Sequence, residues 1–275
     1  MKQFLRAELY RMKKSKSPLI LLIACAGVSL LNSVTYGFMF GNAGWLTGFY
    51  ENVLGFNPFA ISDELGIEAI GTVKSLGDFT ALIVGGNGAL FTALFIGIFL
   101  VSLRRSGFIR NIASEVSRQQ IFVIHAVLIA GFSLLQVLLS AIAPSLVFFL
   151  FYRGLPAESF TDMLLYILTA WLLVAATGIM VLLLTDVFRR PTTAIILSMF
   201  YLWIGASLLF AFTDGGGTVQ NGTAFRLQYV SLVGNLGLLT AGELDTVLSS
   251  LLVVVLYVGL AFALEMTVIK KKDLC

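Results

Sequence analysis

Residues 162–185 read DMLLYILTAWLLVAATGIMVLLLT, and only the first of these residues carries a charge. At 1.5 Å per residue, a helix of this length crosses a hydrocarbon core of about 30 Å. The run gives way to a polar turn that contains Asp186, Arg189, Arg190 and Pro191. The stretch therefore predicts one membrane-spanning helix that ends at a membrane surface.

Five further apolar runs lie before and after this stretch, at residues 18–40, 80–103, 121–152, 192–212 and 245–269. Of the 275 residues, 58% are hydrophobic and 12% are charged, whereas a soluble domain has about 25% charged residues. We therefore predict an all-α fold. The chain is expected to be a polytopic membrane protein with six transmembrane helices, forming a single transmembrane domain over residues 1–275.

The distribution of basic residues predicts the orientation of the six spans. If both termini lie inside, only Lys74, Arg153 and Arg226 of the 18 Lys and Arg residues lie outside, which leaves 15 on the inner side. Lys and Arg near the ends of spans are held on the cytoplasmic side during insertion. We therefore expect cytoplasmic N- and C-termini and a location in the cell membrane as a multi-pass protein.

Three segments outside the spans have characters of their own. Residues 1–17 are basic, and Leu5, Leu9 and Met12, with Phe4 beside them, recur at helical spacing, which predicts an amphipathic helix on the inner membrane surface. Residues 41–79 combine acids with aromatic residues and are expected to form an outer loop. Residues 213–243 are partly apolar but too broken to span, and we expect an outer segment with a re-entrant part.

The spans lack the groups that would drive transport from within this chain. Pumps that use ion gradients keep acids in mid-membrane, and no acid falls in the middle of any predicted span. The glycines from Gly85 to Gly88 are not followed by the Lys and Ser or Thr of a phosphate loop, so close helix packing is the favoured interpretation. We therefore expect no catalytic residue, no nucleotide site and no enzyme activity here, and energy from another polypeptide.

Metal and redox sites are not expected either. The chain has one histidine, His125, and two distant cysteines, Cys25 and Cys275. These residues have no zinc-site spacing, and the cysteines are predicted to be free thiols. His125 is placed at the inner end of the third span, where a solvated residue is favoured over a functional one. Glu265 lies near the inner end of the sixth span, within reach of Lys272 or the interface, and its role stays open.

The longest polar, helix-compatible segment reads RRSGFIRNIASEVSRQQIFVIH, from Arg104 to His125. It holds four arginines and one acid, and Phe108, Ile109, Ile112 and Val116 recur at roughly helical spacing. This pattern predicts a short amphipathic helix over residues 104–120, where the membrane ends and the cytoplasm begins. The plainer alternative is a basic loop that only fixes the topology.

The residues from Ser106 to Ile112, with Val116-Ser117-Arg118 after them, resemble the cytoplasmic loop of ABC-2 type permeases. The basic Lys-Lys-Asp tail directly after the last span resembles the C-termini of the same family. These proteins are the membrane subunits of bacterial ABC exporters, including bacteriocin and bacitracin self-protection transporters. In them the loop contains the coupling helix that docks on the ATPase subunit. Members often carry an acid shortly before the Ser or Asn and the Gly, where this chain has Arg104 and Arg105.

The resemblance implies which residues would contact an ATPase subunit. The expected coupling residues are Arg105, Gly107, Phe108, Ile109, Arg110, Asn111, Glu115, Ser117 and Arg118. Arg189 and Arg190 in the next inner turn would form a second contact.

The resemblance also implies a function: the permease subunit of an ATP-driven exporter in the bacterial cytoplasmic membrane. Such a subunit moves an amphipathic peptide, drug or lipid-like cargo outward, as in antimicrobial resistance. Its partners would be a separate ABC ATPase holding ATP-Mg, a second permease copy or sister permease, and membrane lipid, with no nucleic acid.

Three other functions place different demands on the sequence. A secondary carrier or channel would carry mid-span acids or inverted repeats with matched broken helices. A membrane enzyme needs paired acids or a Ser-His pair within the spans. A non-transporting assembly protein requires none of these features. Gln136, deep in the third span, is expected to hydrogen-bond to another helix whichever function applies.

Overall fold

The structure is a computed structural model that describes residues 2–40, 75–100, 117–151, 157–188, 191–200, 202 and 230–272. Every regular element in these ranges is helical and none is a strand, which confirms the all-α fold class. The elements are α1 Lys2–Lys14, α2 Lys16–Phe40, α5 Leu76–Phe95, η1 Ile96–Leu100, α8 Arg118–Phe151, α9 Phe160–Val187, α10 Pro191–Phe200, α12 Leu232–Leu238 and α13 Leu244–Lys272. The element η1 is a π-helix that directly continues α5.

Five of these stretches are long and apolar enough to cross a membrane. They are Lys16–Gly37, Leu76–Leu100, Gln119–Leu150, Phe160–Val187 and Leu244–Thr267. They correspond to five of the six predicted spans. Of the remaining predicted span, 192–212, the structure describes α10 and Leu202. Residues 41–74 and 213–229 of the predicted outer segments lie outside the described residues.

Two serine caps fix helix starts that the apolar pattern placed too late. The Ser75 hydroxyl accepts a hydrogen bond from the Asp78 backbone N–H (3.2 Å), and Ser159 does the same for Asp162 (3.2 Å). Each acid also lies in the first turn, where the helix dipole favours a negative charge. As a result Leu76–Phe79 form the first turn of α5 and were wrongly predicted as part of the outer loop.

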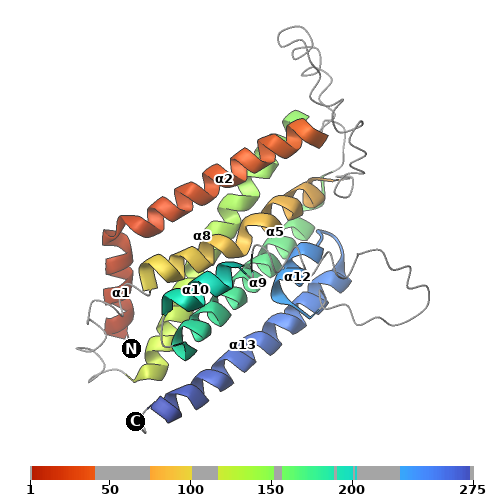
Figure 1. Ribbon diagram of the computed structural model, residues 1–275. Coiled ribbons are helices and arrows are strands. Elements are labelled where there is room, and N and C mark those ends of the chain that lie inside the picture. The colour runs from red at the N-terminus through yellow and green to blue at the C-terminus, as the bar shows by residue number, and fades with distance from the viewer. Residues whose placement is uncertain are drawn as a thin grey trace.

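The long helices form one bundle with three of them at its centre (Figure 1). Most of the α5, α8 and α9 spans is buried, against less than a third of the α2 and α13 spans. Helix α2 packs on α8 and α5, and α13 packs mainly on α9. The two edge helices therefore present most of their surface outward, as helices next to lipid do.

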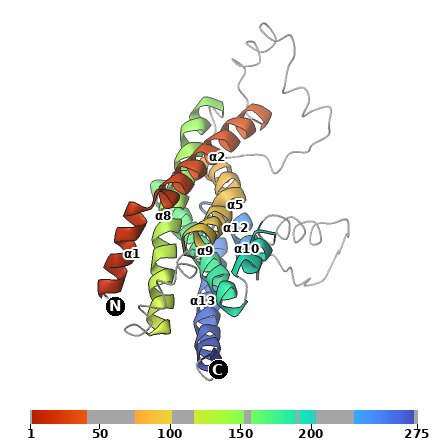
Figure 2. The same cartoon turned by 60° about the vertical axis from the view of Figure 1, so that its left-hand side comes forward.

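The chain runs up and down this bundle, and both termini lie at the same end of it (Figures 1 and 2). At that end the Gln119 amide of α8 contacts the Met266 sulfur of α13 (3.1 Å). At the opposite end the Gly77 N–H of α5 donates to the Glu158 carboxylate just before α9 (2.6 Å). These two contacts tie together helices that are far apart in the sequence.

Helices α5 and α8 are joined by an aromatic stack and a polar contact. The rings of Phe95 and Phe132 are stacked with centroids 4.2 Å apart. The Thr92 hydroxyl donates to the Gln136 side-chain oxygen at 2.6 Å, in a fully buried site. The predicted role of Gln136 as an interhelical hydrogen-bonding residue is therefore confirmed.

The short helix α12 is the described helical part of the predicted re-entrant segment 213–243. Its seven residues are too few to span a membrane, and Leu232–Leu236 are buried against α5, α9 and α13. A Cβ atom at Gly85 would lie 3.5 Å from the Leu236 carbonyl oxygen, which is an ordinary van der Waals distance. An alanine would fit there, so the close-packing interpretation of Gly85 to Gly88 stays a prediction.

The three central helices are in tight contact around Gly178 of α9. A Cβ atom at this position would lie 2.5 Å from Cγ2 of Ile129 in α8 and 2.6 Å from Cγ2 of Thr92 in α5. Both neighbours are buried and β-branched, so neither can move aside without repacking. Gly178 therefore sets the spacing of the three central helices.

We expect Gly178→Ala to lower the free energy of unfolding by about 1–3 kcal/mol, because the added methyl group overpacks the centre of the bundle. The matched control is Gly131→Ala in α8, where nothing lies within 4 Å of the added atom. The control should be neutral or slightly stabilising, since alanine favours a helix over glycine. Thermal unfolding in lipid–detergent micelles measures both, and equal midpoints for the two variants would contradict this account of the packing.

Candidate functional site

Most of the predicted ATPase-contacting residues lie outside the described residues. These are Arg105, Gly107, Phe108, Ile109, Arg110, Asn111 and Glu115, and in the next turn Arg189 and Arg190. The described residues on either side of the first group are the end of η1 at Leu100 and Ser117. The segment 101–116 therefore joins η1 to α8, at the end of the bundle where both termini lie.

Ser117 and Arg118 belong to the start of α8 rather than to a separate amphipathic helix. The Ser117 hydroxyl accepts from the Gln120 N–H (3.3 Å), and its carbonyl accepts from the Ile121 N–H (3.1 Å). Arg118 is the first residue of α8. Ser117 thus acts as the N-cap of α8, and residues 118–120 of the predicted coupling segment 104–120 form the first turn of that helix.

At this end of the bundle, α1 is fastened to the π-helix η1 through Arg11. The Arg11 guanidinium lies over the Phe99 ring, 4.6 Å from its centroid, and donates to the Phe99 backbone carbonyl at 3.4 Å. A guanidinium can make both contacts at once, because it is planar and carries several donors. One arginine therefore holds the ring and the backbone of the turn that leads into residues 101–116.

The apolar face predicted for α1 is present except at one residue. Phe4 is buried, Leu5 and Met12 pack against the core beside it, and Leu9 is 49% exposed. The side of α1 that faces the bundle also carries the buried Glu8. The prediction therefore holds for this face apart from Leu9.

Glu8 is an acid in an apolar setting, and its carboxylate lies 3.9 Å from the Arg11 guanidinium. Burial raises the pKa of Glu8, and the positive charge of Arg11 offsets part of that rise. Burial also lowers the pKa of Arg11, which Glu8 opposes. The arginine stays charged at neutral pH, so Glu8 is the group at this junction whose charge responds to pH.

His125 and Glu265 are both buried, at 1% and 7% exposure. His125 was expected to be a solvated interfacial residue, and that expectation is wrong. The Phe122 and Phe262 rings meet edge to face, with centroids 5.3 Å apart, where α8 and α13 cross. His125 lies one turn further along α8, a helix that also packs on α2, α5 and α9.

We expect Arg11→Ala to release α1 from the bundle, because the substitution removes the ring contact, the carbonyl hydrogen bond and the ion pair together. Hydrogen–deuterium exchange of the α1 amides should rise by about tenfold, the change expected for the loss of contacts worth about 1.4 kcal/mol. Arg6→Ala on the exposed side of α1 serves as the control and should leave exchange unchanged. Equal exchange in the two variants would show that Arg11 does not hold α1.

The raised pKa of Glu8 predicts pH-dependent docking of α1. Docked α1 binds more protons than free α1 at pH values between the ordinary and the raised pKa of Glu8. Docking is therefore strongest below this window and weakens as the pH rises through it. Spin-label distances between α1 and the last turns of α13 should broaden on going from low to high pH. Glu8→Gln should abolish the change and the exposed Glu243→Gln should preserve it, whereas a persistent change in Glu8→Gln would rule out Glu8 as its origin.

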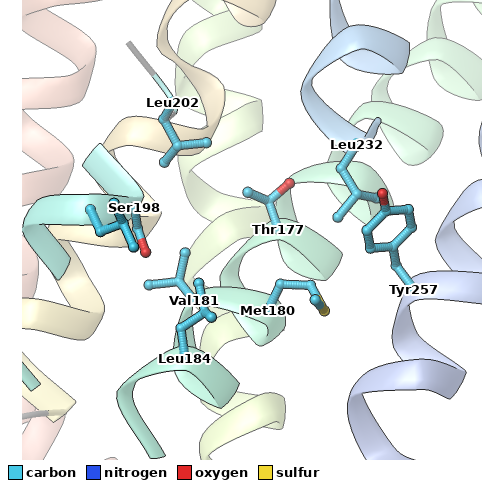
Figure 3. A pocket seen from close by; sticks show the side chains of 9 residues that line it. Thr177, Met180, Val181, Leu184, Ser198, Leu202, Leu232 and Tyr257 are labelled. Carbon is cyan, nitrogen blue, oxygen red and sulfur yellow. The ribbon is translucent and has the colours of Figure 1, made fainter. Parts of the chain in front are cut away.

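A second feature is a cavity of about 380 Å³ between α9, α10, α12 and α13 (Figure 3). Its lining residues belong to these four helices, apart from Leu202 after α10, and are Thr177, Met180, Val181, Leu184, Leu197, Ser198, Leu202, Leu232 and Tyr257. The α9 members recur three and four residues apart and so share one helix face. That stripe was visible in the sequence, but its partners on the other elements were not.

No metal centre is formed by the part of the chain that the structure describes. Within it no group of three or more His, Cys, Asp or Glu side chains is placed to hold an ion. Cys25 is a buried free thiol 3.3 Å from the Ser140 hydroxyl, at the contact of α2 with α8. Its predicted state as a free thiol is confirmed.

Comparison with family models, with curated proteins and with solved structures finds no match to this chain in any of the three.

Proposed function

We propose that this chain is the permease subunit of an ATP-driven ABC exporter of the ABC-2 type. The observation that carries the proposal is where residues 101–116 attach. At one side they continue η1 and α5, and at the other they lead into α8. Since α5 and α8 are central helices, a push on this segment would reach the middle of the bundle directly.

The proposal includes six spans with both termini in the cytoplasm. Helix α9 ends where the termini lie, and α13 starts at the other end (Figure 1). The chain between Val187 and Leu244 therefore returns across the bundle, and α10 begins that return as the first part of a fifth span. The 15 basic residues assigned to the inner side, out of 18 in the chain, support this orientation.

The energy in this proposal comes from a separate ATPase subunit that holds ATP-Mg. The buried acids of the described chain, Glu8 and Glu265, lie near the end that carries the termini. The buried polar side chains deeper in the spans are hydroxyls and amides, such as Thr92, Gln136 and Ser140. This distribution favours a subunit without an ion-coupling group. A second permease copy or a sister permease would complete the exporter in the bacterial cytoplasmic membrane.

One observation favours a secondary carrier as the second candidate. The seven-residue helix α12 packs on α9, α13 and α5, and the cavity lies beside it. Carriers bind substrate near the membrane midplane beside interrupted helices.

The two candidates differ in their energy source. We expect the chain, reconstituted in vesicles with its partner ABC ATPase, to move a fluorescent amphipathic peptide only with ATP. Arg110→Ala should lower ATP-driven transport by about tenfold or more, as expected when a hydrogen-bonded interface charge is lost. Pull-down of the ATPase shows whether the complex still assembles.

Arg226→Ala, in the predicted outer segment, is the matched control and should transport normally. Transport driven by a proton or sodium gradient in vesicles without any ATPase would instead establish the carrier. Normal ATP-driven transport by Arg110→Ala and by a variant with Gly107 to Asn111 replaced would refute the coupling role.

A further inference from the structure

The cavity between α9, α10, α12 and α13 extends from the middle of the bundle toward the end that carries the termini. Tyr257 is at the middle of the 29-residue helix α13, and the lining residues of α9 lie in the second half of that helix. Thr177 and Val181 lie between Tyr257 and Ser198 of α10 (Figure 3). Headgroups and bulk water do not reach the middle of a bilayer, so the part of the cavity at Thr177 and Tyr257 is surrounded by hydrocarbon and protein.

The lining is almost wholly apolar and carries no charged side chain. Six of its nine residues are aliphatic or methionine. Of the three hydroxyls, that of Thr177 is already used, because it donates to the Leu173 carbonyl of its own helix at 2.8 Å. A charged or strongly polar ligand would lose its hydration here without compensation. The chemistry of the lining therefore selects an apolar occupant.

The shape of the cavity connects the interior of the bundle with its surface. Val181 and Leu232 are 3% and 5% exposed and form the deep part. Leu197 of α10 also lines the cavity and is 49% exposed, so one edge opens outward between the helices. At this depth an opening of that kind faces lipid chains. The volume of about 380 Å³ falls in the range of small-molecule pockets.

From these observations we propose that the cavity binds one alkyl chain of a membrane amphiphile, which enters sideways from the bilayer past Leu197. The inference deepens the proposed function by giving a place for the apolar tail of an amphipathic cargo, and it rests on that function only for this role. Binding itself needs neither ATP nor an ATPase subunit. A binding test can therefore fail or succeed independently of a transport test.

The test uses the full chain in lipid nanodiscs with a phosphatidylcholine that carries a photoactivatable diazirine in one acyl chain. After illumination, peptide mass spectrometry should find the label on the α9 residues from Thr177 to Leu184 and around Tyr257. Val181→Phe fills the deep part, and Leu197→Trp blocks the opening at an exposed position where folding is not at risk. Each should lower labelling of the cavity by about tenfold through loss of buried methylene contacts.

Leu256→Phe, on the outward face of α13 at 54% exposure, is the matched control and should retain full labelling of the cavity. Competition by an unlabelled alkyl-modified peptide would identify the ligand as cargo-like, and labelling that resists competition would identify a resident lipid. Both results support an alkyl-chain site. Absence of label on the cavity residues, or equal labelling in Leu197→Trp and Leu256→Phe, overturns the proposal.

Discussion

The close crossing of α5, α8 and α9 at Gly178 is the contact on which the rest of this bundle depends. Between helices in lipid there is no hydrophobic driving force, so packing and interhelical hydrogen bonds must hold them together. Gly178 lets Thr92 and Ile129 approach α9 closely, and Thr92 in turn donates to Gln136. With these three helices fixed, α2 and α13 have surfaces to pack on. The cavity and the α1 junction are both positioned by that arrangement.

Much of this architecture could be predicted from the sequence because the constraint of the bilayer is severe. A long run without charges leaves the backbone few choices other than a helix, and five predicted spans are present as long apolar helices. The helix starts could also have been found. Ser75 and Ser159 each precede an aspartate by three residues, which is a capping signature. The prediction instead placed each helix start at the edge of the apolar run, a few residues later.

Other features could not be predicted, because they depend on partners far apart in the chain. The spacing of apolar residues in α1 places most of them on one face, but the contact of Arg11 with the ring and carbonyl of Phe99, 88 residues away, has no local signal. The burial of His125 depends on the helices packed around α8, which no local pattern reveals. The cavity is lined by four helices and Leu202, and only the α9 stripe had a signal in the sequence.

The described bundle buries hydroxyls and amides among its apolar core residues, and it also exposes many leucines, isoleucines and valines that a water-soluble protein would bury. Ser29, Ser140 and Gln136 are fully buried, while large aliphatic side chains of α2 and α13 form the outer coat. Within a bilayer, loss of tertiary contacts would not expose this coat to water. Individual helices would drift apart as intact cylinders with their backbone hydrogen bonds preserved. In a bilayer, unfolding of this bundle would thus separate the helices from one another without melting them.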